Sequence, residues 1–249
     1  MKKIILILIA AVLLLCSCSP EKRDKNSEFL HEVEELKKEF SSLYGIIFKN
    51  GESIPALESE EAIYTSSGFS FLSDDYSEQD KYIAKVYYYL KRSLMLMENI
   101  RVSSDKDKKA QERIVQLDKT VNRLCHMLNI ENKKEALRAI NDGVYILGEI
   151  TDGYGEKKDA SILKMEYCLN LIEIEATDDV RFSEAISLTE QILKELTEIA
   201  GDESEKEIMI FKEAITSLKD AAKYQDEKLI QMKVELMRAN LDKIELRLK

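Results

Sequence analysis

Few side chains of this chain have a type and spacing that could perform chemistry, and its two histidines are considered first. On a helix, His31 would have Glu34 and Glu35 one turn further on, so a carboxylate could orient the imidazole in a metal or acid–base site. Cys125 and His126 are adjacent, so a helix separates them by about 100° and they cannot both bind one metal ion. A di-iron bundle needs two Glu-x-x-His motifs, which the chain does not have. The alternative, ordinary exposed helix faces, is typical of such patterns, and we expect neither a metal nor a cofactor.

The sequence supports a phosphate-binding site or a nucleophilic catalytic site no better than it supports a metal site. The densest glycine patch, Gly153-Tyr154-Gly155-Glu156-Lys157-Lys158, lacks the following serine or threonine and the preceding strand of a phosphate-binding loop. An ordinary turn between helices explains it. With two histidines and no nucleophile motif, a catalytic triad has little room, and the sequence predicts that the protein is not an enzyme.

Two cysteines in the body of the chain raise the question of a disulfide. Cys125 and Cys168 fall on helices that could be neighbours, and an exported protein can form such a bond. The alternative is two small buried residues that never meet, because sequence spacing alone cannot place two sulfur atoms within bonding distance.

The first 17 residues have the pattern of an export signal. Lys2 and Lys3 precede an apolar run over 4–15, which is shorter than the roughly 20 residues that a membrane-spanning helix needs. Leu15-Cys16-Ser17-Cys18 resembles the lipobox of bacterial lipoproteins, with Leu15 three before the cysteine and Ser17 just before it. The resemblance implies cleavage after Ser17 and acylation of the Cys18 thiol and amine. The alternatives are a plain secretory signal with an incidental cysteine, or an uncleaved anchor.

The charge of the chain limits its partners. It holds 47 acidic and 37 basic residues, a net charge of −10, which becomes −12 when the two lysines of residues 1–17 are removed. A nucleic-acid-binding protein needs a basic surface, so we expect no nucleic acid partner. The acidic balance favours a basic partner surface or simple solubility.

The rest of the chain predicts an all-α fold. Glycine and proline are scarce, with 8 and 2 residues, and apolar residues recur at helical spacing. We expect a tether over 18–27 and one domain over 28–249, a single antiparallel bundle of about seven to eight helices. Ser27, Asn132 and Gly201 are expected at helix ends. The expected helices cover residues 28–49, 78–100, 105–129, 133–150, 158–176, 180–200, 203–223 and 226–248, with a short one near 56–64. Helical-hairpin repeats are the alternative arrangement.

Residues 50–77 interrupt this pattern and gather aromatic side chains. We interpret the segment as a loop folded over the bundle and select its rings as candidate partner contacts, since exposed tyrosines are favoured in binding hot spots. Local burial of the rings against the next helix is the alternative. The candidate contacts are Tyr64, Phe69, Phe71 and Tyr76.

A lipobox, a short charged tether and a helical domain rich in lysine and glutamate together resemble the helical outer-surface lipoproteins of Borrelia-type spirochaetes. The resemblance implies a palmitate-bearing anchor on Cys18, a place in the outer membrane at the cell surface, and a non-catalytic role in adhesion or in capture of a host protein such as a complement regulator. The alternative is a periplasm-facing structural or envelope-assembly lipoprotein. The oligomeric state stays open.

Overall fold

The computed structural model describes residues 25–49, 78–103, 108–201, 204–224 and 226–248. These residues form eight α-helices, and no strand occurs among them, so the predicted all-α bundle is confirmed. In chain order the helices are α2 (Lys25–Lys49), α4 (Glu78–Ser103), α5 (Lys108–Asn129), α6 (Lys133–Gly153), α7 (Lys157–Ile174), α8 (Asp179–Ala200), α9 (Glu205–Lys223) and α10 (Glu227–Leu248).

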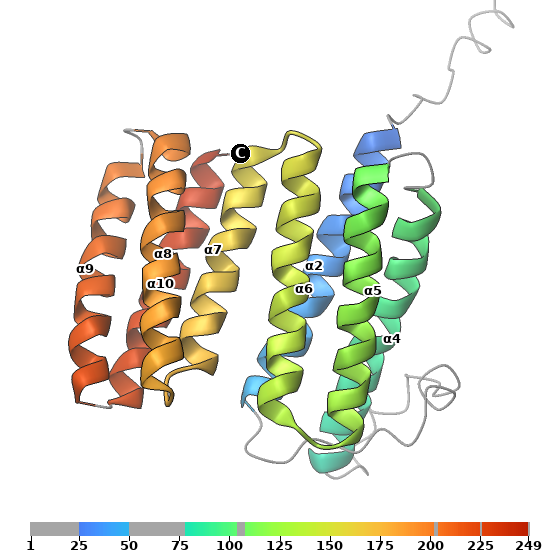
Figure 1. The fold of residues 1–249 in the computed structure, drawn as a ribbon, viewed down its shortest axis with the longest axis horizontal. Coiled ribbons are helices and arrows are strands. Elements are labelled where there is room, and N and C mark those ends of the chain that lie inside the picture. The colour runs from blue at the N-terminus through green and yellow to red at the C-terminus, as the bar shows by residue number, and fades with distance from the viewer. Residues whose placement is uncertain (1–24, 50–77, 104–107, 202–203, 225, 249) are drawn as a thin grey trace, which may run out of the picture.

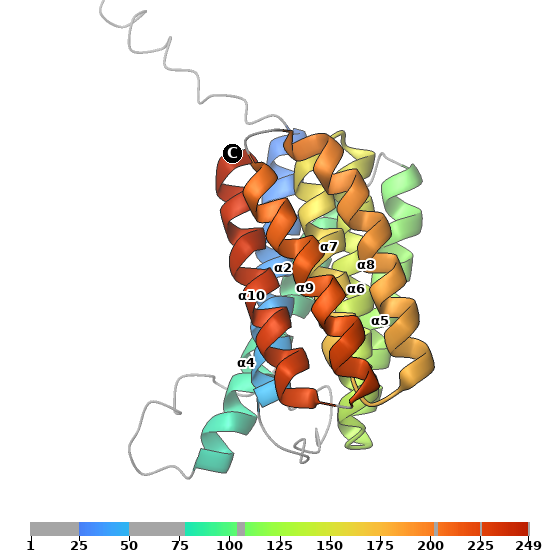
Figure 2. The same cartoon turned by 90° about the vertical axis from the view of Figure 1, so that its left-hand side faces the viewer.

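The helices run up and down in two groups of four that lie side by side (Figures 1 and 2). In the first group α2, α4, α5 and α6 pack in a closed ring, and in the second α7, α8, α9 and α10 do the same. Packing of α6 on α7 joins the groups. The buried apolar residues accordingly form two clusters, centred one on each group of helices.

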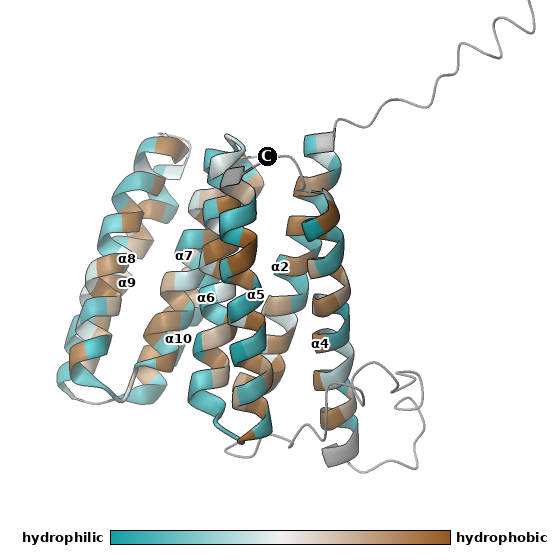
Figure 3. Cartoon of the chain, turned by 45° about the vertical axis from the view of Figure 1, so that its right-hand side comes forward, coloured by the Kyte–Doolittle hydropathy of each residue, from teal (hydrophilic) through white to brown (hydrophobic). Residues whose placement is uncertain are grey.

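Apolar stripes turn each helix toward its own cluster, as the brown faces in Figure 3 indicate. Helix α7 contributes to both clusters, and α6, α8 and α10 all pack on it. Its side chains are consequently buried on several sides: Leu163 and Ile174 belong to the first cluster, while Met165, Cys168 and Ile172 belong to the second. Helix α7 is therefore the element through which the two groups of helices share an interface.

Several helix ends follow local sequence signals. The Asn132 side chain accepts a hydrogen bond from the Glu135 amide and caps α6, and Gly201 ends α8 at a φ of +62°, a region that favours glycine. Both predicted positions are confirmed. Other predicted boundaries differ from the structure by up to three residues. Helix α2 begins at Lys25, so Ser27 lies inside it and the predicted tether ends earlier. Helix α6 continues to Gly153, because the Thr151 hydroxyl donates to the Leu147 carbonyl at 2.9 Å and so is satisfied within the helix.

Helices α2 and α6 approach each other closely at Gly143. A Cβ atom at Gly143 would lie 2.5 Å from Cε2 of Phe40, whose side chain is fully buried. The contact at Gly148, further along α6, is less close, because a Cβ atom added there would lie 3.3 Å from the Cβ atom of Leu163. The two glycines thus set how near α6 lies to its neighbours. Among the described helices none is long and apolar enough to cross a bilayer.

Candidate functional site

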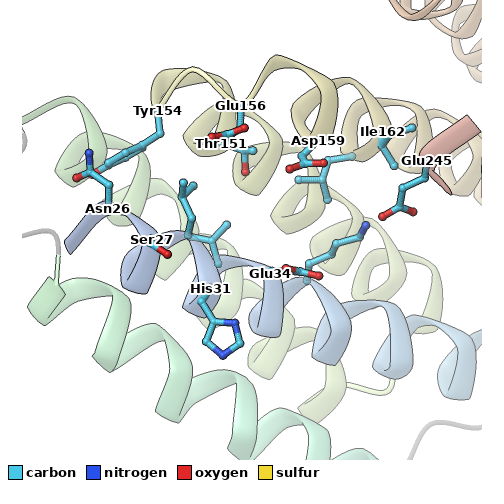
Figure 4. Close-up of a pocket in the computed structure, with 14 residues that line it drawn as sticks. Asn26, Ser27, His31, Glu34, Thr151, Tyr154, Glu156, Asp159, Ile162 and Glu245 are labelled. Carbon is cyan, nitrogen blue, oxygen red and sulfur yellow. The ribbon is translucent and has the colours of Figure 1, made fainter. Parts of the chain in front are cut away.

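A cleft of about 630 Å³ opens at one end of the molecule, where the two groups of helices meet (Figure 4). Its walls are the first turns of α2, the end of α6, the turn into α7 and the last turns of α10. The floor is apolar and includes Leu30, Val33, Ile162 and Leu163. The polar lining residues are Asn26, Ser27, His31, Glu34, Lys37, Thr151, Tyr154, Glu156, Asp159 and Glu245.

The turn between α6 and α7 shapes the mouth of the cleft. Gly155 has a φ of +89°, which reverses the chain over a few residues and which glycine adopts without strain. The Tyr154 ring stacks on Phe29 of α2 with ring centres 4.8 Å apart. Lys158 donates to the Leu248 carbonyl at 3.2 Å, so the start of α7 is also held to the end of α10. The glycine patch is thus an interhelical turn, as predicted.

The charge of the lining is mostly negative. Carboxylates come from α2, from the turn, from α7 and from α10, whereas Lys37 is the one lysine or arginine among the residues that line the cleft. Lys37 is itself paired with Glu166 at 3.2 Å. Such a lining suits a positively charged group rather than a phosphate or a carboxylate.

Next to the cleft, a polar seam runs between the two groups of helices; it consists of Tyr44, Asn141, Asn170, Glu173 and Arg238. Asn170 donates to the Asn141 side-chain oxygen at 3.0 Å, and Arg238 of α10 donates to the Asn170 side-chain oxygen at 2.7 Å. One oxygen of Glu173 accepts from Arg238 at 2.5 Å and from the Tyr44 hydroxyl at 3.2 Å. The polar seam therefore connects α2, α6, α7 and α10 by hydrogen bonds.

Burial changes the proton affinity of groups in and near the polar seam. It raises the pKa of Tyr44 well above its ordinary value, and the neighbouring Glu173 carboxylate adds to this effect. Burial also raises the pKa of Glu166, and Lys37 offsets only part of that rise. Tyr44 therefore stays a neutral hydrogen-bond donor at neutral pH, the form that the polar seam requires.

A cluster of three charged side chains, Glu175, Arg138 and Lys134, joins α6 to the end of α7 at the end of the molecule opposite the cleft. The Glu175 carboxylate is almost fully buried and accepts two parallel hydrogen bonds from Arg138, at 2.6 and 2.7 Å. It also forms an ion pair with Lys134 at 3.1 Å. Burial alone would raise the pKa of Glu175, but the bonds from Arg138 and Lys134 outweigh it and hold that pKa below its ordinary value. The group fixes the end of α7 rather than forming a site.

The structure brings together only part of the predicted group of His31, Glu34 and Glu35. His31 and Glu34 both line the cleft, but His31 is exposed and its ring points away from Glu156 and Asp159 (Figure 4). Glu35 instead accepts a hydrogen bond from Lys38 at 2.8 Å. Cys125 is buried and His126 exposed, so this pair is split between core and solvent. Within the described ranges no group of three metal-ligating side chains could hold an ion.

No disulfide bond joins Cys125 and Cys168 in the structure. Both are buried, Cys125 in the first apolar cluster and Cys168 in the second, which is the predicted alternative of two buried residues that do not meet. Burial raises the pKa of the Cys168 thiol to about 12, so it stays protonated and unreactive at neutral pH.

The remaining predicted site residues lie outside the described residues. These are the lipidation site Cys18 and the candidate partner contacts Tyr64, Phe69, Phe71 and Tyr76. Conversely, Tyr154, Glu156, Asp159 and Glu245 of the cleft were not predicted as site residues. They come from a turn and two helices far apart in the chain, and each is of a type that an ordinary solvent-facing position also carries. Comparisons with protein-family models, characterised proteins and solved structures find no match to this chain.

Proposed function

We propose that this chain is a lipid-anchored, non-catalytic binding module, held in the bacterial envelope through Cys18 and offering the segment 50–77 to a protein partner, on the cell surface a host protein. The observation that supports this most is the direction of α2. Its first residue, Lys25, follows the predicted anchor, and its last residue, Lys49, lies at the opposite end of the bundle beside the start of α4 (Figure 1). The anchor and the segment 50–77 therefore join the bundle at opposite ends.

The lengths of the tether and of α2 give the distances in this arrangement. Seven residues lead from Cys18 to Lys25, so the bundle starts within about 25 Å of the acylated residue. Helix α2 has 25 residues, and its far end stands about 37 Å beyond its start. The cleft lies at the end of the bundle where α2 begins, which under this proposal is the end nearer the membrane, while residues 50–77 are joined at the opposite end. A partner approaching from outside would meet that far end first.

The composition of the segment suits protein recognition. Aromatic rings provide large contact areas with little conformational entropy to lose, and they are enriched among residues that dominate binding energy. The acidic residues Glu58, Glu60, Asp74 and Asp75 stand beside these rings in the sequence. A partner with a basic surface would be attracted by these charges, and weakening of the binding by salt would follow.

Replacement of Cys18 by serine is expected to abolish lipid attachment, because the hydroxyl cannot form the thioether. The variant should incorporate no labelled palmitate and should keep residues 1–17, which intact-mass measurement detects. Cys16→Ser is the matched control, two residues away, and should be labelled and cleaved like the unchanged protein. Label on the Cys18 variant, or loss of label from the Cys16 variant, would show that the lipobox interpretation is wrong.

Combined replacement of Tyr64, Phe69, Phe71 and Tyr76 by alanine should reduce capture of host serum or matrix proteins by cells at least about tenfold, as loss of hot-spot residues does. Tyr224→Ala is the control, because Tyr224 is an exposed ring in the turn between α9 and α10. Equal capture by the quadruple variant and the control, with both folded, would remove these residues as contacts.

Protease treatment of intact and of lysed cells tests the location. Cleavage of the chain on intact cells supports a surface role. Survival in intact cells with cleavage after lysis would contradict that role and would favour the alternative of an envelope-assembly lipoprotein.

A further inference from the structure

The cleft between α2, α7 and α10 lacks the cations that would balance its carboxylates. Glu34, Glu156, Asp159 and Glu245 line it, and Lys37 is the one lysine or arginine beside them. Three other grooves between the described helices have linings in which the numbers of acidic and basic residues differ by one at most. The excess of negative charge is therefore a property of this cleft and not of every groove on an acidic protein.

Two of these carboxylates have no partner among the described residues. The side chains of Glu156 and Asp159 make no ion pair and no hydrogen bond there, and Glu156 stands at the start of α7 without capping it. The dipole of α7 favours carboxylates at this end of the helix but does not neutralise them. Figure 4 shows Asp159 across the cleft from Glu34 of α2, so negative charge stands on both walls.

Lys37 does not supply the missing positive charge. Its ammonium group lies 3.2 Å from the Glu166 carboxylate, and both side chains are mostly buried. Burial raises the pKa of Glu166, Lys37 offsets part of the rise, and the nearby Glu245 carboxylate adds to it. Two carboxylates thus share one lysine, and a positive charge from outside the chain would be favourable beside them.

The form of the cleft limits the kind of cation that it can hold. Within the described ranges, no three acidic, histidine or cysteine side chains could hold one metal ion. The carboxylates instead surround an apolar floor formed by Leu30, Val33, Ile162 and Leu163. The volume of about 630 Å³ lies in the range of pockets for small ligands. A matching ligand has several positive charges that are separated from one another by apolar groups.

We propose that the cleft binds an aliphatic polyamine, a molecule whose ammonium groups are separated by short methylene chains. The ammonium groups pair with Glu156 and Asp159 on one wall and with Glu34 on the other, and the methylene groups leave water for the apolar floor. Each exposed ion pair contributes little alone, so the affinity depends on several pairs acting together with the floor. The site is separate from the segment 50–77, and the inference holds whether or not the chain is acylated.

Titration calorimetry of the purified full chain in a non-ionic detergent, with spermidine as the probe, tests the proposal. We expect one spermidine molecule to bind per chain. Hexaamminecobalt(III) has the same positive charge without methylene groups, and it should bind at least about tenfold more weakly because it gains nothing from the apolar floor. Equal affinities for the two cations would mean that the cleft acts only as an acidic surface and would overturn the proposal.

Two double variants locate the binding. Glu156→Gln with Asp159→Asn should weaken spermidine binding about fivefold or more, because it removes two ion pairs and preserves the shape of both side chains. Glu184→Gln with Glu205→Gln is the matched control, since it removes the same charge from exposed positions of α8 and of the first turn of α9, outside the cleft. The control should bind spermidine like the unchanged chain.

Equal affinities of the two double variants for spermidine would overturn the proposal, because only the net charge of the protein would then matter. Tighter binding of a lysine peptide with the same charge as spermidine would also overturn it and would assign the cleft to a protein partner. None of these results affects the palmitate and protease experiments, so failure of the polyamine site and failure of the proposed function are distinguished.

Discussion

Arg238→Met is expected to lower the free energy of unfolding by about 3 kcal/mol, the cost of breaking a buried ion pair from one side. The Glu173 carboxylate, whose side chain is only 7% exposed, would lose its one charged partner in the polar seam. Asn170 would lose the hydrogen bond that Arg238 donates to its side-chain oxygen. The Tyr44 hydroxyl would remain as a neutral donor to Glu173, which limits the loss.

Urea unfolding followed by circular dichroism measures this effect. The control is Arg123→Met, which breaks the exposed pair between Arg123 and Asp142 and should cost less than about 1 kcal/mol. The double variant Glu173→Leu with Arg238→Met should be more stable than Arg238→Met alone, because no buried charge remains unpaired. A single variant as stable as the Arg123 control would show that the polar seam contributes no more than a surface pair.

Gly143→Ala is expected to destabilise the protein by about 1–3 kcal/mol, the range for overpacking a core. Alanine favours a helix over glycine by about 1 kcal/mol, so propensity alone predicts the opposite sign. The added methyl group would lie 2.5 Å from the buried Phe40 ring, and either the ring or the helix must move. Steric conflict should outweigh propensity here because Phe40 is fully buried and cannot turn aside.

Gly45→Ala provides the control for propensity alone. No atom lies within 4 Å of a Cβ atom at Gly45, so this substitution should stabilise α2 by up to about 1 kcal/mol. Phe40→Leu should relieve the conflict, so that Gly143→Ala costs less on the Phe40→Leu background than on the unchanged one, as a double-mutant cycle measures. An increase in stability for both glycine variants would mean that α2 and α6 separate more easily than their packing indicates.

Much of the helical architecture was predictable from local signals. Apolar residues at helical spacing placed all eight described helices, and Asn132 and Gly201 marked ends that the structure confirms. One error arose where a side chain found a partner within the helix. Thr151 resembles a turn residue in sequence, yet its hydroxyl bonds to the Leu147 carbonyl and the helix continues. Ser27 resembles a cap, although the helix starts before it.

The division of the core and the composition of the cleft were not predictable in the same way. Asn170, Glu173 and Arg238 of the polar seam each occupy a position that is equally compatible with a solvated helix face, and only the docking of α10 on α7 brings them together. The cleft likewise combines residues 26–37, 151–163 and 245, which no local pattern connects. Pairing of helices is decided by long-range packing, so the sites formed between helices are decided there as well.

The position of α2 also has a mechanical consequence. The covalent path from any residue of 50–77 back to the start of the chain passes through α2 alone, because both Lys25 and Lys49 belong to that helix. A pulling force between the predicted anchor and a partner bound to residues 50–77 would thus act as tension along the axis of α2, which packs on α4 and α6 along its length. Unwinding α2 under this tension would break its packing on α4 and α6, so these contacts protect the helix, while the covalent path of the force does not pass through any other described helix.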